Sequence, residues 1–338
     1  MKIIVLGYRS ALSFWSSIGS STRTSLLPDD DAETVLVSAR VPFRDQSAML
    51  VEALASLGIH APLECVVAIP DASRRMTHVR VHTHMINLPS NSLAYVGTVP
   101  CDGEALRVYV VTPELCLVQM GCLMRRHELA ELAFEFCGDY ALRPDGAGGT
   151  ALVERPRVTT EEKLRAYVKS AEGVSGVKRA RFAAECAIDG SRSPRESQIA
   201  LEMTLSHRLG GYGLPRPRLN VPITPTGHAR QVAGVRELIP DLYWPDAKVV
   251  LEYDSDAFHT RDERERERDI RKRNAYGMMG LYAISLTRRQ YDDSLQFSGV
   301  MNDLAKHLGC ESHRLTTTQQ CKRAKLHGFL LRGNRMLR

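Results

Sequence analysis

The stretch from Ile239 to Asp254, IPDLYWPDAKVVLEYD, decides how the C-terminal part of the chain folds. It contains two apolar runs joined by a Pro-Asp turn, a pattern typical of two neighbouring strands. Because side chains alternate between the two faces of a strand, one face of the second strand is expected to carry Lys248, Val250, Glu252 and Asp254. Two carboxylates then project together beside Asp241 of the neighbouring strand.

Acidic side chains gathered at a strand end repel one another, and a protein that tolerates them supplies a cation or protonates one of them. Mg²⁺ is held by one or two carboxylates together with phosphate oxygens. Bound there, it lowers the pKa of a water molecule and stabilises charge on a phosphodiester during displacement. The stretch therefore predicts a hydrolytic site that uses Mg²⁺ or Mn²⁺.

Segments on both sides of this stretch alternate between helical and strand patterns. In chain order we expect a helix at 194–209, strands at 218–223, 232–242 and 248–254, a helix at 261–276, a strand at 281–286 and a helix at 288–308. That succession predicts an α/β domain with a mixed sheet flanked by helices, in a chain that is α+β overall.

A chain of 338 residues is expected to form two or three domains. Strand-like alternation and a helix opened by Thr112-Pro113 indicate a smaller α+β region over residues 1–150. The Gly- and Pro-rich segment 141–156 predicts a boundary there. A helical linker at 151–192, with one helix opened by Thr159 and Glu162 and another at 177–187, then leads to the domain at 193–310, and a basic tail follows at 311–338.

Composition is that of an ordinary globular protein, with 43% hydrophobic and 25% charged residues. No apolar run is long enough for a membrane span, so a cytoplasmic protein without membrane contact is expected. The eight cysteines include no Cys-x-x-Cys pair, which favours reduced thiols over a zinc site. His78, Arg80, His82 and His84 alternate along one expected strand, and we interpret them as an exposed polar face.

The C-terminal segment from Glu311 to Arg338 holds seven Lys or Arg and one acidic residue, so its charge equals the +6 of the whole chain. Such a tail could add salt-sensitive contacts to nucleic-acid phosphates. A solubilising, frayed terminus explains it equally well.

Pro240-Asp241 followed by Glu252-x-Asp254 resembles the signature of the PD-(D/E)XK nuclease superfamily. More closely, the chain is similar to the very-short-patch-repair-like domain of unknown function of many bacterial proteins. The pattern of that family matches Glu252, Asp254, His259, Asp269, Arg273 and Gly280. Its upstream motifs match Ser193-Pro194-Arg195-Glu196 and Gly213-Leu214-Pro215-Arg216-Pro217, and the resemblance covers roughly 115 residues.

The resemblance implies a restriction-endonuclease-like fold and divalent-metal-dependent cleavage of DNA. Asp241 and Glu252 would bind the metal, Glu196 would be a third acid, Asp254 would belong to the catalytic set, and His259 would transfer a proton or bind phosphate. The chain departs from the superfamily pattern at Asp254, where lysine is usual, and from the closer family at Ser255, where glycine is usual.

The missing lysine leaves several candidates for a positive charge beside the phosphate. Lys248 on the same strand, or Lys272 or Arg273 on the following helix, could stabilise developing negative charge. Together with Arg268 these residues are our candidates for nucleic-acid contact.

Several of these residues also have structural explanations. Glu196 completes a capping box with Ser193, Asp241 could be a turn residue, and His259 could cap a helix. The whole domain could also be a catalytically inert DNA-binding regulator of antitoxin type, or a protein-interaction module. The segments Tyr8 to Leu12 and Thr112 to Leu142 are similar to an abortive-infection type IV antitoxin-like region, which implies a protein partner for the N-terminal part.

Overall fold

The structure is a computed structural model that describes residues 2–19, 27–29, 32–40, 47–55, 57–60, 62–68, 78–83, 88–101, 103–145, 149–255, 263–311 and 313–332. The chain is α+β, as the sequence predicts. It forms two compact units, one from Met1 to Ala187 and the other from Ile188 to Met336.

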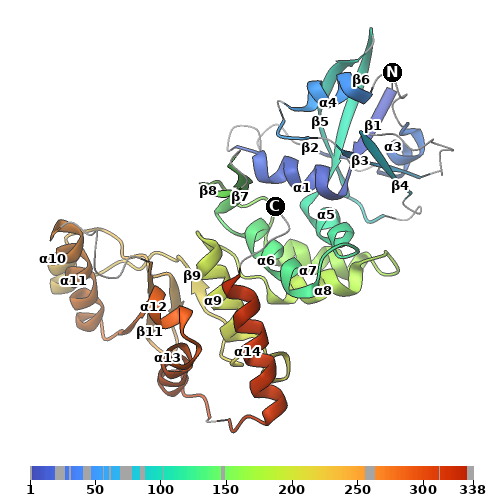
Figure 1. Cartoon of the computed structure of the whole chain (residues 1–338). Coiled ribbons are helices and arrows are strands. Elements are labelled where there is room, and N and C mark those ends of the chain that lie inside the picture. The colour runs from blue at the N-terminus through green and yellow to red at the C-terminus, as the bar shows by residue number, and fades with distance from the viewer. Residues whose placement is uncertain are drawn as a thin grey trace. The chain divides into compact units, whose positions relative to one another are not determined.

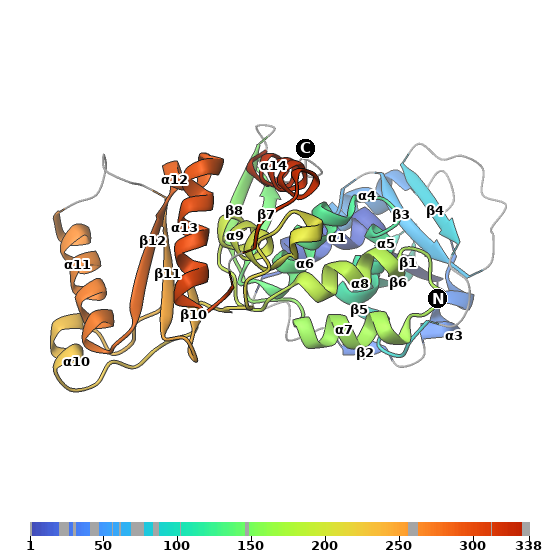
Figure 2. The same cartoon turned by 90° about the horizontal axis from the view of Figure 1, so that it is seen from below.

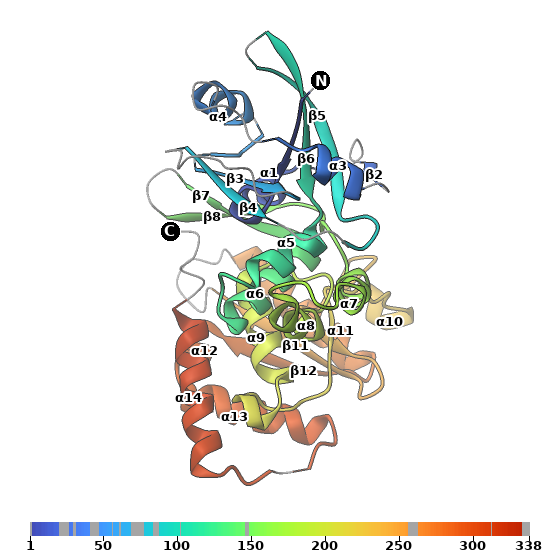
Figure 3. The same cartoon turned by 90° about the vertical axis from the view of Figure 1, so that its right-hand side faces the viewer.

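The first unit is built on a mixed sheet with the strand order β2-β5-β6-β1-β3-β4. Its strands are β1 (Lys2–Leu6), β2 (Leu27–Asp29), β3 (Leu63–Val67), β4 (Val79–Thr83), β5 (Leu93–Cys101) and β6 (Glu104–Val111). The long hairpin of β5 and β6 is clear in Figure 3. β1 runs parallel to β6 and antiparallel to β3, so the sheet is mixed at its centre.

Helices of the first unit either follow the strands or pack against one another (Figure 1). They are α1 (Tyr8–Ser17), α3 (Ala32–Ser38), α4 (Ser47–Ala55), α5 (Pro113–Met120), α6 (Arg126–Cys137), α7 (Glu161–Ser170) and α8 (Val177–Cys186); the small hairpin β7 (Tyr140–Pro144) and β8 (Thr150–Glu154) follows α6. Pro113 opens α5 and Gly138 follows α6, as expected from the sequence.

The helices expected as a linker at 151–192 belong to the first unit. Both α7 and α8 pack on α5, and α8 also packs on α6. This packing buries Leu164, Ala180 and Ala183 completely, and burial of such apolar side chains stabilises the packed arrangement. The units therefore divide after Ala187 instead of near residue 150, and the cap of α7 is Thr160, whose hydroxyl accepts from Lys163 N, instead of Thr159.

The polar side chains of β4 match the exposed face expected from their alternation only in part, because the Arg80 side chain is 60% exposed whereas that of His82 is 26% exposed. Arg80 and His82 turn toward Glu64 of β3, which is 1% exposed. The Glu64 carboxylate accepts hydrogen bonds from the backbone N (2.8 Å) and the guanidinium (3.2 Å) of Arg9, and Tyr8 stacks on His82. Glu64 thus acts as an anionic cap for α1, a structural role. His84 lies outside the described residues.

A second buried acid of the first unit, Glu135 on α6, makes stability depend on pH. Burial raises the pKa of Glu135 from 4.5 to about 7, against the opposing effects of Arg155 and of the Leu142 N–H that donates to its carboxylate. The folded state therefore holds a proton that the unfolded chain loses, so the unfolding free energy falls as pH rises from 4.5 to 7. We expect a fall of about 3 kcal/mol.

Glu135→Gln is expected to remove this pH dependence. The chain has two tryptophans, Trp15 in the first unit and Trp244 in the second. Urea unfolding at pH 5 and pH 8, followed by Trp15 fluorescence in a Trp244→Phe background, measures the first unit by itself. An equal loss of stability at high pH in both proteins would show that Glu135 is not its cause.

The second unit contains residues 239–254 with the predicted acidic site. Its strands are β9 (Arg218–Leu219), β10 (Leu242–Trp244), β11 (Val249–Asp254) and β12 (Tyr282–Thr287), in the order β12-β11-β10-β9. β9, β10 and β11 are successively antiparallel, whereas β12 is parallel to β11. The helices are α9 (Pro194–Thr204), α10 (Gly227–Ala233), α11 (Glu263–Met278), α12 (Arg288–Asp292), α13 (Ser294–His307) and α14 (Thr317–Leu331).

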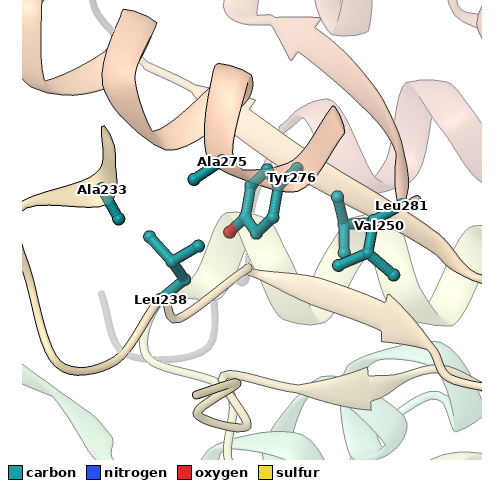
Figure 4. Close-up of a cluster of buried hydrophobic side chains, with 6 residues drawn as sticks. All are labelled: Ala233, Leu238, Val250, Ala275, Tyr276 and Leu281. Atoms are coloured by element: carbon teal, nitrogen blue, oxygen red, sulfur yellow. The ribbon is translucent and has the colours of Figure 1, made fainter. Parts of the chain in front are cut away.

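Helices cover both faces of this sheet. Figure 2 shows α10 and α11 on one side of β11 and β12, and α12 and α13 on the other. On the first side Val250 of β11 packs with Tyr276 and Ala275 of α11, and Leu238 and Leu281 complete the cluster (Figure 4). The ladder of β11 with β12 fixes the register Glu252 to Ser285 and Asp254 to Thr287.

Several expected elements of the second unit were wrong in detail. Residues 227–233 form α10, which ends at Gly234 in the left-handed conformation (φ 66°), where a strand had been expected from 232. The first helix ends at Thr204, and the helix expected at 288–308 is divided at Asp293, whose side chain caps α13. Glycine and aspartate at these positions favour such helix ends.

The expected basic tail contains a packed helix. α14 contacts α9 and the turn at His207–Leu209, and it buries Leu326, His327 and Leu330. The imidazole Nδ1 of His327 lies 3.1 Å from the carboxylate of Glu202 on α9, and both side chains are buried. Apolar residues at helical spacing within the charged segment explain the packing.

The described helices include none long and apolar enough to cross a membrane. All eight cysteines are free thiols, and five of them are buried.

Candidate active site

Asp241 and Glu252 lie side by side on adjacent strands of the second unit. Leu242 of β10 pairs with Leu251 of β11, so the next residues outward in this antiparallel register are Asp241 and Glu252. The turn and β11 lie close to where the sequence predicts them, whereas β10 begins at Leu242, the last residue of the strand expected at 232–242. The pairing of β10 with β11 thus fixes where the backbone presents both carboxylate residues.

The environment of Asp241 favours proton or cation binding. Burial raises its pKa to about 7, and the negative charges of Glu252 and Glu196 add to the increase. The Tyr253 N–H donates to Asp241 Oδ2 at 2.7 Å and opposes the shift. Among the described residues no donor reaches the other carboxylate oxygen, so Oδ1 can accept a further ligand.

Glu252 is held by two donors from one helix. The ammonium of Lys272 lies 2.8 Å from Glu252 Oε2 and also donates to the Ile239 carbonyl at 2.9 Å. The Tyr276 hydroxyl donates to Glu252 Oε1 at 2.7 Å. Lys272 and Tyr276 are four residues apart on α11, so both face β11.

Glu196 is 8% exposed, and its carboxylate accepts three hydrogen bonds from the protein. The Ser193 hydroxyl donates to one oxygen at 2.8 Å, and the Arg192 N–H and the Asn220 side-chain amide donate to the other at 2.9 and 2.6 Å. Asn220 has a left-handed backbone (φ 51°), and its backbone N–H donates to the Asp241 carbonyl. Glu196 therefore ties the start of α9 to the chain just before β10, and contributes negative charge near Asp241.

This arrangement predicts different outcomes for two substitutions of Glu196. Glu196→Ala is expected to lower the unfolding free energy by about 2 kcal/mol, because three donors lose their acceptor. Glu196→Gln should stay within about 0.5 kcal/mol of wild type, since its amide oxygen can accept from Arg192 and Asn220 while its NH₂ donates to the Ser193 oxygen. Urea denaturation of wild type and the two variants measures both changes in unfolding free energy. Equal destabilisation by Gln and Ala would show that the negative charge itself is needed.

A small pocket of about 120 Å³ opens beside Glu252 between α11 and the strands β11 and β12. Its charged lining consists of Glu252, Asp254, Asp269, Lys272 and Arg273. Arg273 donates to the Ser285 hydroxyl at 2.9 Å. Glu252 and Asp254 of the Glu-x-Asp motif thus line the same pocket as the basic residues Lys272 and Arg273 of α11.

Other predicted site residues lie apart from this cluster. Lys248 is not in β11 but in the turn before it, with a positive φ of 55°, roughly 13 Å along the strand from Glu252 at the usual rise per residue. Arg268 is exposed on α11 and outside the pocket lining. His259 lies outside the described residues.

Sequence reasoning missed Tyr276 and Asn220. Asp269, Lys272, Arg273 and Tyr276 recur at the spacing of one helix face, a signal that would have placed Tyr276 with the predicted basic residues. Asn220 had no comparable signal, because its contacts join three segments distant in sequence.

The residues present fit a hard cation with few protein ligands. Within the described ranges no three His, Cys, Asp or Glu side chains are grouped to enclose a metal. Mg²⁺ needs no such enclosure, because it is bound by one or two carboxylates and completes its shell with water and substrate phosphate. The paired Asp241 and Glu252 carboxylates provide that minimal donor set.

Comparison of the chain with protein-family models, with curated proteins and with solved structures finds no match, so the geometry of Asp241, Glu252 and their neighbours is the basis for assigning a function.

Proposed function

We propose that the protein is a divalent-metal-dependent endonuclease that hydrolyses phosphodiester bonds of DNA. The observation that carries this proposal is that Asp241 and Glu252 each stand one residue beyond the Leu242–Leu251 pair of β10 and β11, with Asp241 Oδ1 left for a ligand. Two carboxylates fixed by neighbouring strands are suited to a Mg²⁺ or Mn²⁺ ion that is shared with a phosphate.

The order of elements also supports the proposal. α9 is followed by β9, α10 and the antiparallel strands β10 and β11, and then by α11 and the parallel strand β12. Asp241 directly precedes β10, and Glu252 is in β11. This is the order that the resemblance to the PD-(D/E)XK superfamily implies. Fold likeness does not fix function, so the proposal depends on the acidic pair.

Each part of the site has a distinct task in hydrolysis. The carboxylates of Asp241 and Glu252 would hold the cation, and Glu196 would keep the chain before β10 in place. A bound Mg²⁺ supplies Lewis acidity and lowers the pKa of its water. Lys272 and Arg273, which line the same pocket, would stabilise negative charge on the phosphate. His259 is the proposed proton-transfer or phosphate-binding group, by resemblance alone.

The test is cleavage of supercoiled and single-stranded DNA by the purified chain with Mg²⁺, with Mn²⁺ and with a chelator, alongside Asp241→Asn. We expect metal-dependent cleavage by wild type and its loss in the variant, which keeps the size and the acceptor for Tyr253 N. Cleavage that survives both the chelator and Asp241→Asn would contradict the proposal.

One observation favours a second function from a different class. The Lys272 ammonium pairs with Glu252 and supplies a positive charge where a metal would bind. A nuclease fold that had exchanged its metal for this lysine would bind DNA without cutting it. Salt-sensitive DNA binding by a folded wild type that neither binds Mn²⁺ nor cleaves would favour this regulator.

A further inference from the structure

Two donors from α11 hold the Glu252 carboxylate, and they differ in mobility: the Tyr276 hydroxyl donates to Oε1, whereas the Lys272 ammonium lies 2.8 Å from both oxygens. Tyr276 is 1% exposed, and its ring lies within the cluster of Figure 4, between Leu238 on one side and Val250 and Leu281 on the other. Its hydroxyl therefore has a fixed position from which to donate to Glu252 Oε1 at 2.7 Å. Neither the superfamily signature nor the helical charge pattern contains this tyrosine.

Lys272 is the movable donor. Its side chain is 27% exposed. Its ammonium lies 2.8 Å from both carboxylate oxygens of Glu252 and donates to the Ile239 carbonyl at 2.9 Å. The pocket that contains this ammonium also contains the carboxylates of Asp254 and Asp269. A rotation of the flexible lysine stem within the pocket can therefore move its charge from Glu252 toward another acid.

We propose that Lys272 is an internal cation that a divalent metal displaces from Glu252, and that Tyr276 is a positioning residue that holds the Glu252 carboxylate in both states. The inference rests on the proposed function of the acidic pair. Lys272 keeps Glu252 neutralised before the metal arrives, and its charge moves toward Asp254 and Asp269 afterwards. Tyr276 restrains the carboxylate so that it stays beside Asp241.

The two residues then have opposite effects on metal affinity. Removing the Lys272 ammonium abolishes a competitor and leaves an unneutralised carboxylate, so Lys272→Met is expected to bind Mn²⁺ at least about tenfold more tightly, a change typical of partners that surround metal ligands. Removing the Tyr276 hydroxyl frees the Glu252 side chain, so Tyr276→Phe is expected to bind Mn²⁺ about tenfold more weakly. A purely structural role would not move the two affinities in opposite directions.

The experiment is calorimetric titration of Mn²⁺ into the full chain without DNA. Tyr276→Phe keeps the buried ring and Lys272→Met keeps the apolar stem, and thermal unfolding checks that each variant is folded. Matched controls are Lys248→Met, which removes the same charge from a distant turn, and Tyr282→Phe, which removes a hydroxyl from an exposed ring. Both controls should stay within about twofold of wild type, in keeping with screening of distant charges.

Unchanged or weaker binding by Lys272→Met, or unchanged binding by Tyr276→Phe, overturns the inference while leaving the proposed metal site in place. Absence of Mn²⁺ binding in wild type and in Lys272→Met overturns both the inference and the proposed function. An equal gain for Lys248→Met would assign the effect to net charge and would also overturn the inference.

Discussion

Glu252→Gln is expected to reduce metal-dependent DNA cleavage by about a thousandfold. Losing a charged metal ligand removes several kcal/mol of transition-state stabilisation, and each 1.4 kcal/mol or so corresponds to a factor of ten in rate. The glutamine amide keeps the size of the side chain and can still accept from the Tyr276 hydroxyl. The loss should therefore come from chemistry and metal affinity while the fold is kept.

The measurement is the rate of plasmid nicking at saturating DNA with Mg²⁺ or Mn²⁺. Glu237→Gln, an exposed glutamate of the same unit, is the matched control and should cleave like wild type. Circular dichroism and thermal unfolding establish that the Glu252 variant is folded. Cleavage by Glu252→Gln within about tenfold of wild type would exclude Glu252 as a metal ligand, because ligand loss has a larger effect.

His327→Ala is expected to lower the unfolding free energy of the second unit by about 3 kcal/mol. The imidazole lies 3.1 Å from Glu202, whose side chain is completely buried, and it also stacks on Phe297. Burial raises the pKa of Glu202, and the hydrogen bond from His327 opposes that increase. Removing His327 leaves a buried carboxyl without this partner and a cavity beside Phe297.

Urea unfolding followed by Trp244 fluorescence in a Trp15→Phe background reports the second unit by itself. His228→Ala changes an exposed histidine and should lie within about 0.5 kcal/mol of wild type. A second variant, Glu202→Gln combined with His327→Ala, should recover part of the loss because the buried charge is gone. Stability of His327→Ala equal to that of the control would show that α14 is not docked through this pair.

Much of the second unit could be predicted from the sequence because its signals are local. The alternation from Val249 to Asp254, the Pro-Asp turn and the Ser193 cap each specify an element within a few residues. The apolar residues Val232, Leu238 and Ile239 predict a strand where α10 ends, although Gly234 between them favours a helix end. α14 was read as a tail because its positive charges obscured Leu326 and Leu330 at helical spacing.

The acidic pair could be predicted from strand pairing, but its partners could not. Asp241 and Glu252 follow from one hairpin, whose register the turn and the apolar pattern determine. The contacts of Glu252 with Lys272 and Tyr276 depend on how α11 packs over β11, which is set by tertiary burial of Val250, Ala275 and Leu281. Asn220 joins Glu196 to the chain before β10 through contacts that no periodicity describes.

Anomalous scattering from crystals soaked in Mn²⁺ would locate the ion without reference to activity. One strong peak is expected at about 2.0–2.2 Å from carboxylate oxygens of both Asp241 and Glu252, with the Lys272 ammonium moved away from Glu252. The absence of a peak at this pair in crystals that bind Mn²⁺ elsewhere, with Lys272 still bonded to Glu252, would contradict the proposed metal site.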